Sequence, residues 1–208
     1  MKHEWRKTEK SDYLPSDQPE IITIPTYRYI ALNGEGDPNQ AAFQRRVEIL
    51  YSVAYGIKMA PRKGILIDGY YDYTVYPLEG IWDYSEQAKK NGWVGKEHLV
   101  YTIMIRQPLF VSEKLLSQVV TLKKFDDPDV LFDQVRLIEH TDGLCVQMMH
   151  VGSFDSEPIS FAKMKNYIEE KGLVREDLRH REIYLSDFRN TEADKLRTVL
   201  RVFVEKKV

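Results

Sequence analysis

Apolar residues recur every three or four positions in three segments, which is the spacing of one helix face. Helices are therefore expected over residues 37–59, 112–125 and 157–172. Asp37 is a candidate N-cap followed by a proline, Ser112 is a second candidate N-cap, and Gly172 is a candidate C-terminal cap.

Shorter apolar runs between these segments predict strands. They cover residues 20–35, 72–82, 98–110, 132–152, 180–187 and 200–207. The run at 132–152 contains the sequence HTDG, and its Asp142–Gly143 pair favours a tight turn, so a hairpin is expected there. A polar loop is expected up to Lys96, and a short helix over 191–200. Residues 1–19 are polar and predict a loosely tied N-terminal arm.

The predicted elements follow one order twice, namely strand, helix, strand, strand. The first copy spans residues 20–125 and the second 130–208. This repetition predicts an α+β fold in a single domain, 20–208, with duplicated modules related by pseudo-twofold symmetry. A central ligand cleft between the two copies is the natural place for a binding site.

Composition narrows the class of protein. The chain of 208 residues is 43% hydrophobic, which is enough to bury a core. It is 30% charged with a formal net charge of −2, so no basic patch for binding nucleic acid is indicated. No apolar run approaches a membrane span, and the first residues lack the apolar region of a secretory signal. The single cysteine, Cys145, fits a reducing cytoplasmic setting and is expected to be buried packing. Nothing in the pattern selects an oligomeric state.

Cofactor motifs are not expected. The five histidines and one cysteine have no zinc spacing, and the acidic residues near Asp68 do not have the spacing of a calcium loop, so we predict no metal. The sequence GEGDPN at 34–39 lacks the Lys-Ser/Thr pair of a phosphate loop and is interpreted as a turn into a helix, so no cofactor is predicted.

A glutamate lies inside the strand HREIYLSD (180–187), where glutamate is unfavourable. Strand alternation places Glu182 and Tyr184 on one face and Ile183 on the other. If Ile183 faces the helix layer, Glu182 faces the open side of the sheet. Glu182 is then either a solvated surface residue or a carboxylate that points into a site. Matching the two copies by their tyrosines places Thr74 and Tyr76 in the positions of Glu182 and Tyr184.

Five ordered motifs resemble the GyrI-like small-molecule-binding domain, and more narrowly its stand-alone subfamily. They are GEGDPN, YSVAYGIKM, YPLEGIW, CVQMMHVGSFDSEP and HREIYLSDFRNTEADKLRTVLR, between residues 28 and 204. The resemblance implies two strand–helix–strand–strand modules around a cleft for bulky aromatic, often cationic compounds. It also implies that a glutamate on a late strand, here Glu182, is the anionic partner. Some stand-alone members are hydrolases that open the cyclopropane of DNA-alkylating natural products.

The resemblance and the strand pattern together give a candidate site. Glu182 is the candidate base or charge partner, and Tyr76 and Tyr184 are the candidate donors to a carbonyl that becomes a phenolate. Trp82 is expected to line the cleft. Further lining candidates are Tyr71, Tyr101, Met148, Tyr70 and Trp93. His180 is expected to be a surface or capping residue, and His150 a hydrogen-bonded histidine of the core or its rim.

Three functions fit this pattern. The first is capture of planar aromatic xenobiotics followed by hydrolysis of a strained electrophile. The second is a multidrug-binding module that sequesters or senses such ligands without turnover. The third is inhibition through protein contact, which neither a basic nor a DNA-mimicking acidic patch supports.

Overall fold

The chain forms two compact units, each assembled from separate segments. The computed structural model describes residues 2–187 and 190–207. Unit 1 comprises Met1–Glu4, Tyr27–Leu78 and Tyr84–His140, and unit 2 comprises Trp5–Thr26, Glu79–Asp83 and Thr141–Val208. The division predicted from the sequence, an arm at 1–19 followed by modules at 20–125 and 130–208, follows a different criterion and stays a prediction.

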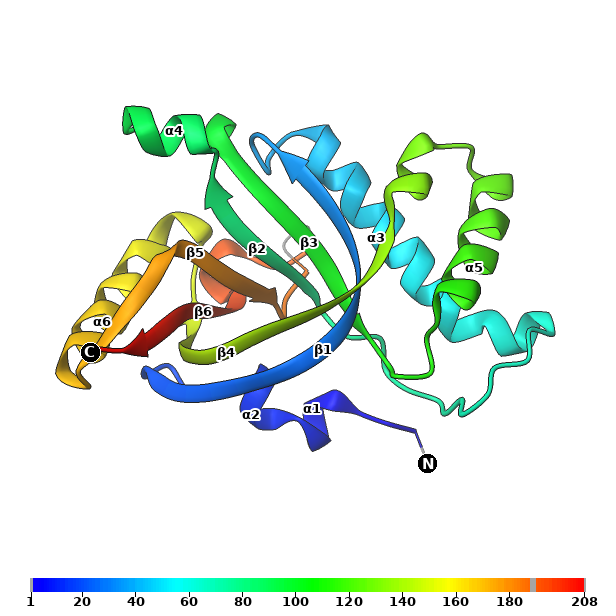
Figure 1. Ribbon diagram of the computed structural model, residues 1–208, viewed down its shortest axis with the longest axis horizontal. Helices are drawn as coiled ribbons and strands as arrows, with labels where there is room; N and C mark the ends of the chain where they lie inside the picture. Colours follow the sequence, from blue (N-terminus) through cyan, green and yellow to red (C-terminus); the bar gives the residue numbers. More distant parts are fainter. Residues whose placement is uncertain (1, 188–189, 208) are drawn as a thin grey trace. The chain divides into compact units, whose positions relative to one another are not determined.

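Strands and α-helices alternate along the chain from Glu20 to Tyr184 (Figure 1). The strands are β1 (Glu20–Glu35), β2 (Leu78–Tyr84), β3 (Leu99–Gln107), β4 (Arg136–Val151), β5 (Leu173–Tyr184) and β6 (Arg197–Lys206). The helices are α1 (Trp5–Thr8), α2 (Lys10–Tyr13), α3 (Ala41–Met59), α4 (Glu86–Asn91), α5 (Glu113–Asp126) and α6 (Glu157–Glu170). The hydrogen-bonded strand order is β1-β3-β2-β5-β6-β4, and this antiparallel sheet closes as a barrel. The predicted α+β class is confirmed, whereas the duplication and its symmetry stay predictions.

In unit 1, helices α3 and α5 pack closely together, as Figure 1 also shows. The C-terminal half of β1 pairs with β3 in antiparallel register, from Arg28 opposite Gln107 to Glu35 opposite Val100. Gly56 of α3 lies against Val119 of α5, where a Cβ atom would come within 2.6 Å of the valine methyl. The absence of a side chain at this position therefore allows the two helices to approach.

In unit 2, α6 covers one face of a three-stranded sheet in which β6 pairs with both β4 and β5. The helix contributes Met164 and Ile168 to a buried cluster. The sheet contributes Val146, Met148, Leu173, Leu200, Val202 and Val204. The apolar positions of α6 predicted from sequence are thus the ones that face the sheet.

The N-terminal segment is ordered, and the expectation of a loosely tied arm is wrong. Trp5 and Tyr13 are only 1% and 2% exposed, and their ring centroids lie 5.1 Å apart. The backbone carbonyl of Asp12 accepts a hydrogen bond from Nη2 of Arg201 at 2.7 Å. Trp5 and Tyr13 lie eight positions apart in an otherwise polar segment, so composition and periodicity did not identify them as buried anchors.

Two of the strand predictions are also wrong. The expected hairpin around HTDG does not form, because β4 runs as one strand of 16 residues in which Gly143 adopts a positive φ of 67°. The strand expected over 72–82 begins only at Leu78, so Thr74 and Tyr76 lie outside it. In both places local turn or strand preference is overruled by contacts with distant segments.

The helix predictions are correct in their centres and less so at their ends. Ser112 caps α5 by accepting a hydrogen bond from the Leu115 amide, and Gly172 follows α6 with a φ of 64°. Asp37 is not the cap of α3, whose N-cap is Gln40. The short helix expected over 191–200 is a 3-10 turn, Ala193–Lys195, followed by β6. The polar segment before Lys96 contains α4.

Candidate functional site

Glu182 is a buried carboxylate rather than a solvated one. Its side chain is 10% exposed although it lies near the end of β5. Oε1 lies 3.0 Å from Nε2 of His180, and Oε2 accepts a hydrogen bond of 2.7 Å from the Tyr184 hydroxyl. These two partners are the residues two positions before and after Glu182, which strand alternation places on the same face.

Trp82 fixes the direction of the Tyr184 hydrogen bond. Its Nε1 donates to the Tyr184 oxygen at 2.8 Å. An indole nitrogen is only a donor, so the tyrosine oxygen accepts from it and the hydroxyl proton is directed to Glu182. Gly80 makes room for this arrangement, because a Cβ there would lie 2.7 Å from Nε1 of Trp82. The result is a chain of donors that runs from Trp82 through Tyr184 to the carboxylate.

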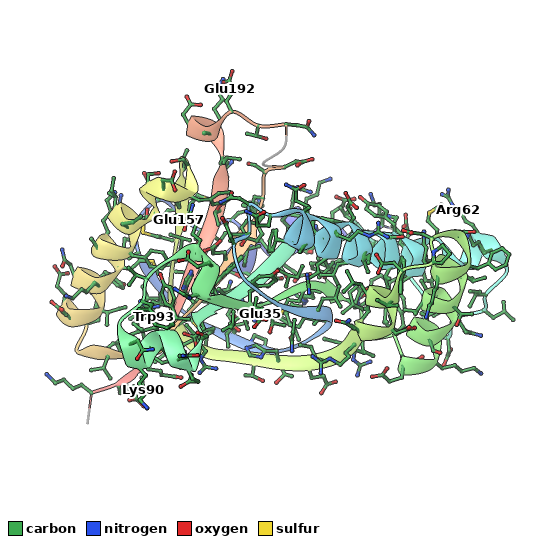
Figure 2. All side chains as sticks on the ribbon, turned by 90° about the horizontal axis from the view of Figure 1, so that it is seen from above. Glu35, Arg62, Lys90, Trp93, Glu157 and Glu192 are labelled. Carbon is green, nitrogen blue, oxygen red and sulfur yellow. The ribbon has the colours of Figure 1, made fainter. Side chains whose placement is uncertain are left out.

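The electrostatics of the site keep Tyr184 protonated. Burial raises the pKa of Tyr184 well above its usual value, and the neighbouring charge of Glu182 raises it further. Glu157, at the start of α6 (Figure 2), is 8% exposed and adds a smaller effect in the same direction. Tyr184 is therefore a neutral hydrogen-bond donor at every ordinary pH.

Glu182 lies on the sheet face that α6 covers, so the expectation that it faces the open side is wrong. Its cross-strand partner is Leu200, which belongs to the cluster beneath α6. The ring of His180 packs edge-on against Phe161 of α6, with 5.0 Å between centroids. Phe154, just before α6, meets Tyr184 in the same manner at 6.0 Å. The carboxylate is thus framed by aromatic rings within unit 2.

His180 was not expected to take part in the site. It is 20% exposed and bonded to Glu182, whereas sequence reasoning placed it at the surface or in a cap. The available signal was its i−2 position relative to Glu182 on the same strand. A histidine at that position is on the carboxylate's own face.

The opposite face of β5 carries a buried ionic network that sequence analysis missed. Arg181 is fully buried and binds Asp142 through two hydrogen bonds of 2.8 and 2.6 Å, and Glu79 at 2.8 Å. Arg201 binds the same Asp142 at 3.0 Å and also the side-chain oxygen of Gln147. The network contains two arginines and two carboxylates, so its positive and negative charges compensate one another where water is excluded.

Several predicted site residues lie in unit 1. Tyr76 is 3% exposed, and its hydroxyl is 3.2 Å from Nε2 of His3. Tyr70 and Tyr71 both pack against Phe110, with centroid distances of 5.2 and 5.3 Å. Unit 1 therefore holds an aromatic cluster of its own around residues 70–76.

The other lining candidates are placed differently. Tyr101 is buried against Phe43, at 5.2 Å between centroids, and burial raises its pKa. Trp93, which follows α4 (Figure 2), is 43% exposed and stacks on His98. Met148 is a core residue of unit 2 beneath α6.

Two further residues behave as the sequence predicts. Cys145 is buried, and burial, followed by the charge of Asp142, raises its pKa to about 12, so it is not a nucleophile at neutral pH. His150 is 4% exposed, with Nδ1 2.9 Å from the Ser160 hydroxyl and Nε2 3.0 Å from the Ser153 carbonyl oxygen. His150 is a hydrogen-bonded core histidine that ties β4 to α6.

Residues 2–187 and 190–207 lack the features of a metal site and of a membrane-spanning helix. They contain no group of three or more His, Cys, Asp or Glu side chains arranged to hold a metal ion. None of their helices is both long and apolar enough to cross a membrane.

Comparison with known proteins identifies the family. A crystal structure of a hydrolase from Listeria innocua matches with a TM-score of 0.88 and 36% identity, covering 98% of this chain and all of that one. A second hydrolase structure from the same organism matches at 0.89 and 37%, covering 99% of this chain and all of that one. The EcmrR C-terminal domain, at 13% identity and a TM-score of 0.54, covers 91% of this chain and 98% of that one and shares the fold. The search of curated proteins gives no match. The sequence profile of the GyrI-like small molecule binding domain matches residues 17–204, and the chain therefore belongs to this family.

Proposed function

We propose that the protein binds bulky planar aromatic molecules, including lipophilic cations, and hydrolyses strained electrophiles such as cyclopropane-bearing DNA alkylators. The observation that carries the proposal is Glu182, a carboxylate that is 10% exposed, held by two hydrogen bonds and flanked by aromatic rings. The family supports small-molecule binding, and two relatives at 36% and 37% identity are hydrolases.

The binding step follows from the surroundings of Glu182. Aromatic faces attract a flat or cationic ligand, each contact being worth about 0.5–2 kcal/mol. A carboxylate in a place with little water attracts a cation more strongly than one in bulk solvent. Because His180 and Tyr184 hold Glu182 in one position, little of the binding energy is lost in ordering it.

The hydrolytic step needs a base and a donor. Water attacks the cyclopropane carbon, the strained C–C bond breaks, and its electron pair passes to the conjugated carbonyl, which becomes a phenolate. Glu182 takes the proton that the attacking water loses, and the phenolate takes up a proton, so the net change is addition of one water molecule. A hydrogen-bond donor to the carbonyl oxygen would stabilise the phenolate as it forms.

Tyr184 takes a different part from the one expected from the sequence. Its proton is directed to Glu182 because Trp82 donates to its oxygen. We therefore assign Tyr184 to positioning the carboxylate and not to donating to the ligand. Tyr184→Phe would leave Oε2 of Glu182 without this donor and should lower turnover more than ligand affinity.

The test is incubation of the protein with a cyclopropane-bearing duocarmycin-like compound, with the ring-opened alcohol measured by mass spectrometry. Glu182→Gln keeps the shape of the side chain and removes the base, so we expect kcat to fall about 10²–10⁴-fold. Glu176→Gln is the matched control, because it makes the same change at an exposed position of β5 and should leave kcat unchanged. Equal turnover of wild type and Glu182→Gln would refute the assignment.

A second candidate function is binding without turnover. Both oxygens of Glu182 already accept hydrogen bonds, which suits a fixed anion that pairs with a cationic ligand. A sequestering or sensing module would bind the lipophilic cation tetraphenylphosphonium stoichiometrically and form no alcohol from the cyclopropane compound. Glu182→Gln should then weaken cation binding, and this loss would be measured by isothermal titration calorimetry.

A further inference from the structure

A cavity of about 470 Å³ lies between α6 and the sheet of unit 2, away from the Glu182 carboxylate. This volume is within the range of about 300–1,000 Å³ that is usual for ligand sites. Its lining is mostly apolar. The lining residues are Phe161, Ala162, Met164, Lys165, Ile168, Glu169, Leu173, Val174, Arg175 and Val202. An occupant of this cavity must therefore carry a substantial apolar portion.

Arg175 is the least exposed of the charged residues in this lining. Its Nη2 donates to the carbonyl oxygens of Leu178 and Arg179 at 2.6 and 3.0 Å, which fixes the guanidinium. Its Nε is buried and has no hydrogen-bond acceptor among the residues that the structure describes. A buried donor left without an acceptor is unfavourable, and an oxygen of a ligand would relieve it.

The charge at this wall is also incompletely compensated. Burial lowers the pKa of Arg175, and the charges of Asp177 and Asp83 offset only part of this effect. The guanidinium carbon lies 6.0 Å from the centre of the Phe161 ring, so the charge borders the apolar lining. Lys165 adds a second cation at an exposed position of α6, against one exposed carboxylate, Glu169.

We propose that this cavity binds an amphiphilic carboxylate, with the apolar chain between α6 and the sheet and the carboxylate on Arg175. A guanidinium binds a carboxylate oxygen with charge-assisted hydrogen bonds, which are about twice as strong as neutral ones. The apolar chain gains by leaving water for a lining of Met, Ile, Leu and Val side chains.

This site is distinct from the one proposed for catalysis. Phe161 lines the cavity and packs against His180, and His180 in turn binds Glu182. Two side chains thus separate the cavity from the carboxylate. The inference does not depend on the reaction proposed at Glu182, and variants at the two positions distinguish the sites.

The experiment is isothermal titration calorimetry of the full chain with decanoate below its micellar concentration. Decan-1-ol and decyltrimethylammonium, which have the same chain with a neutral and a cationic head, are the matched ligands. We expect decanoate to bind most tightly and Arg175→Gln to weaken it about tenfold or more, since one charge-assisted hydrogen bond is lost. Ala162→Trp, at an exposed lining position, should block all three ligands.

Glu182→Gln should leave decanoate binding unchanged, and Arg175→Gln should leave turnover at Glu182 unchanged. Three results would overturn the proposal. These are equal affinity for decanoate and decyltrimethylammonium, unchanged decanoate affinity in Arg175→Gln, and unchanged affinity in Ala162→Trp. Loss of decanoate binding in Glu182→Gln with retention in Ala162→Trp would place the ligand at the other site and equally refute it.

Discussion

Neighbouring residues on β5 carry opposite kinds of charge to opposite faces of the sheet. Glu182 is bonded to His180 and Tyr184 on the face that α6 covers, while Arg181 meets Asp142 and Glu79 on the other. Alternation predicted that Glu182 and Tyr184 share a face, and this is confirmed. The partners across the sheet were not predictable, because side-chain pairing over 39 and 102 positions leaves no local pattern.

The ionic network gives a prediction at this scale. Arg181→Met removes a fully buried cation and leaves Asp142 and Glu79 with less compensation, so the free energy of unfolding should fall by about 3–5 kcal/mol. Urea denaturation followed by circular dichroism measures this change.

Arg179→Met is the matched control, since Arg179 is exposed on the same strand and pairs with the partly exposed Asp177. Its loss should cost at most about 1 kcal/mol. Similar losses in the two variants would contradict the role given to the buried network.

At the scale of elements, the contact between α3 and α5 depends on Gly56. Alanine in place of glycine normally stabilises a helix by about 1 kcal/mol. Here the new methyl would lie 2.6 Å from Val119 Cγ1, and overpacking of this kind costs about 1–3 kcal/mol. We expect Gly56→Ala to lower the melting temperature despite its better helix propensity.

The control is a second change at the partner. Val119→Ala removes the methyl that the new side chain meets, so the double variant Gly56→Ala/Val119→Ala should be more stable than the sum of the two single changes predicts. Additive effects, measured by thermal denaturation of all four proteins, would argue against the contact.

The helices were the most predictable elements, because the apolar spacing that defines α3, α5 and α6 is the spacing by which they pack. The prediction of a tight turn at HTDG was wrong for a physical reason. Its Asp-Gly pair suits a tight turn locally, but Asp142 binds Arg181 and Arg201, which come from β5 and β6. The predicted start of β2 was wrong for a similar reason, because residues 72–77 alternate like a strand yet form an irregular segment in which Tyr73 packs against Phe110.

At the scale of the molecule, the N-terminal segment completes unit 2. Deleting residues 2–13 would remove the buried Trp5 and Tyr13, and with them the carbonyls of Ser11 and Asp12 that Gln147 and Arg201 bind. The lost burial exceeds the entropy regained by the chain, so we expect the free energy of unfolding to fall by roughly 2–5 kcal/mol. Urea denaturation provides the measurement.

Lys7→Ala and Lys10→Ala serve as controls for this deletion. Both lysines are exposed in the same segment, and changing them should leave stability within about 0.5 kcal/mol of wild type. A deletion variant as stable as the full chain would restore the expectation of a loosely tied arm.

Strands β1 and β4 each begin in one unit and end in the other, and β2 has its ends in unit 1 and its middle in unit 2, which has a consequence for dissecting the protein. A fragment that ends at residue 140 holds all of unit 1, but it also carries Trp5, Tyr13 and Trp82 without the sheet that buries them. A fragment that starts at residue 141 holds that sheet without Glu79 or Trp82, and so without the donor that directs Tyr184 toward Glu182. No single cut in the chain therefore separates the two units.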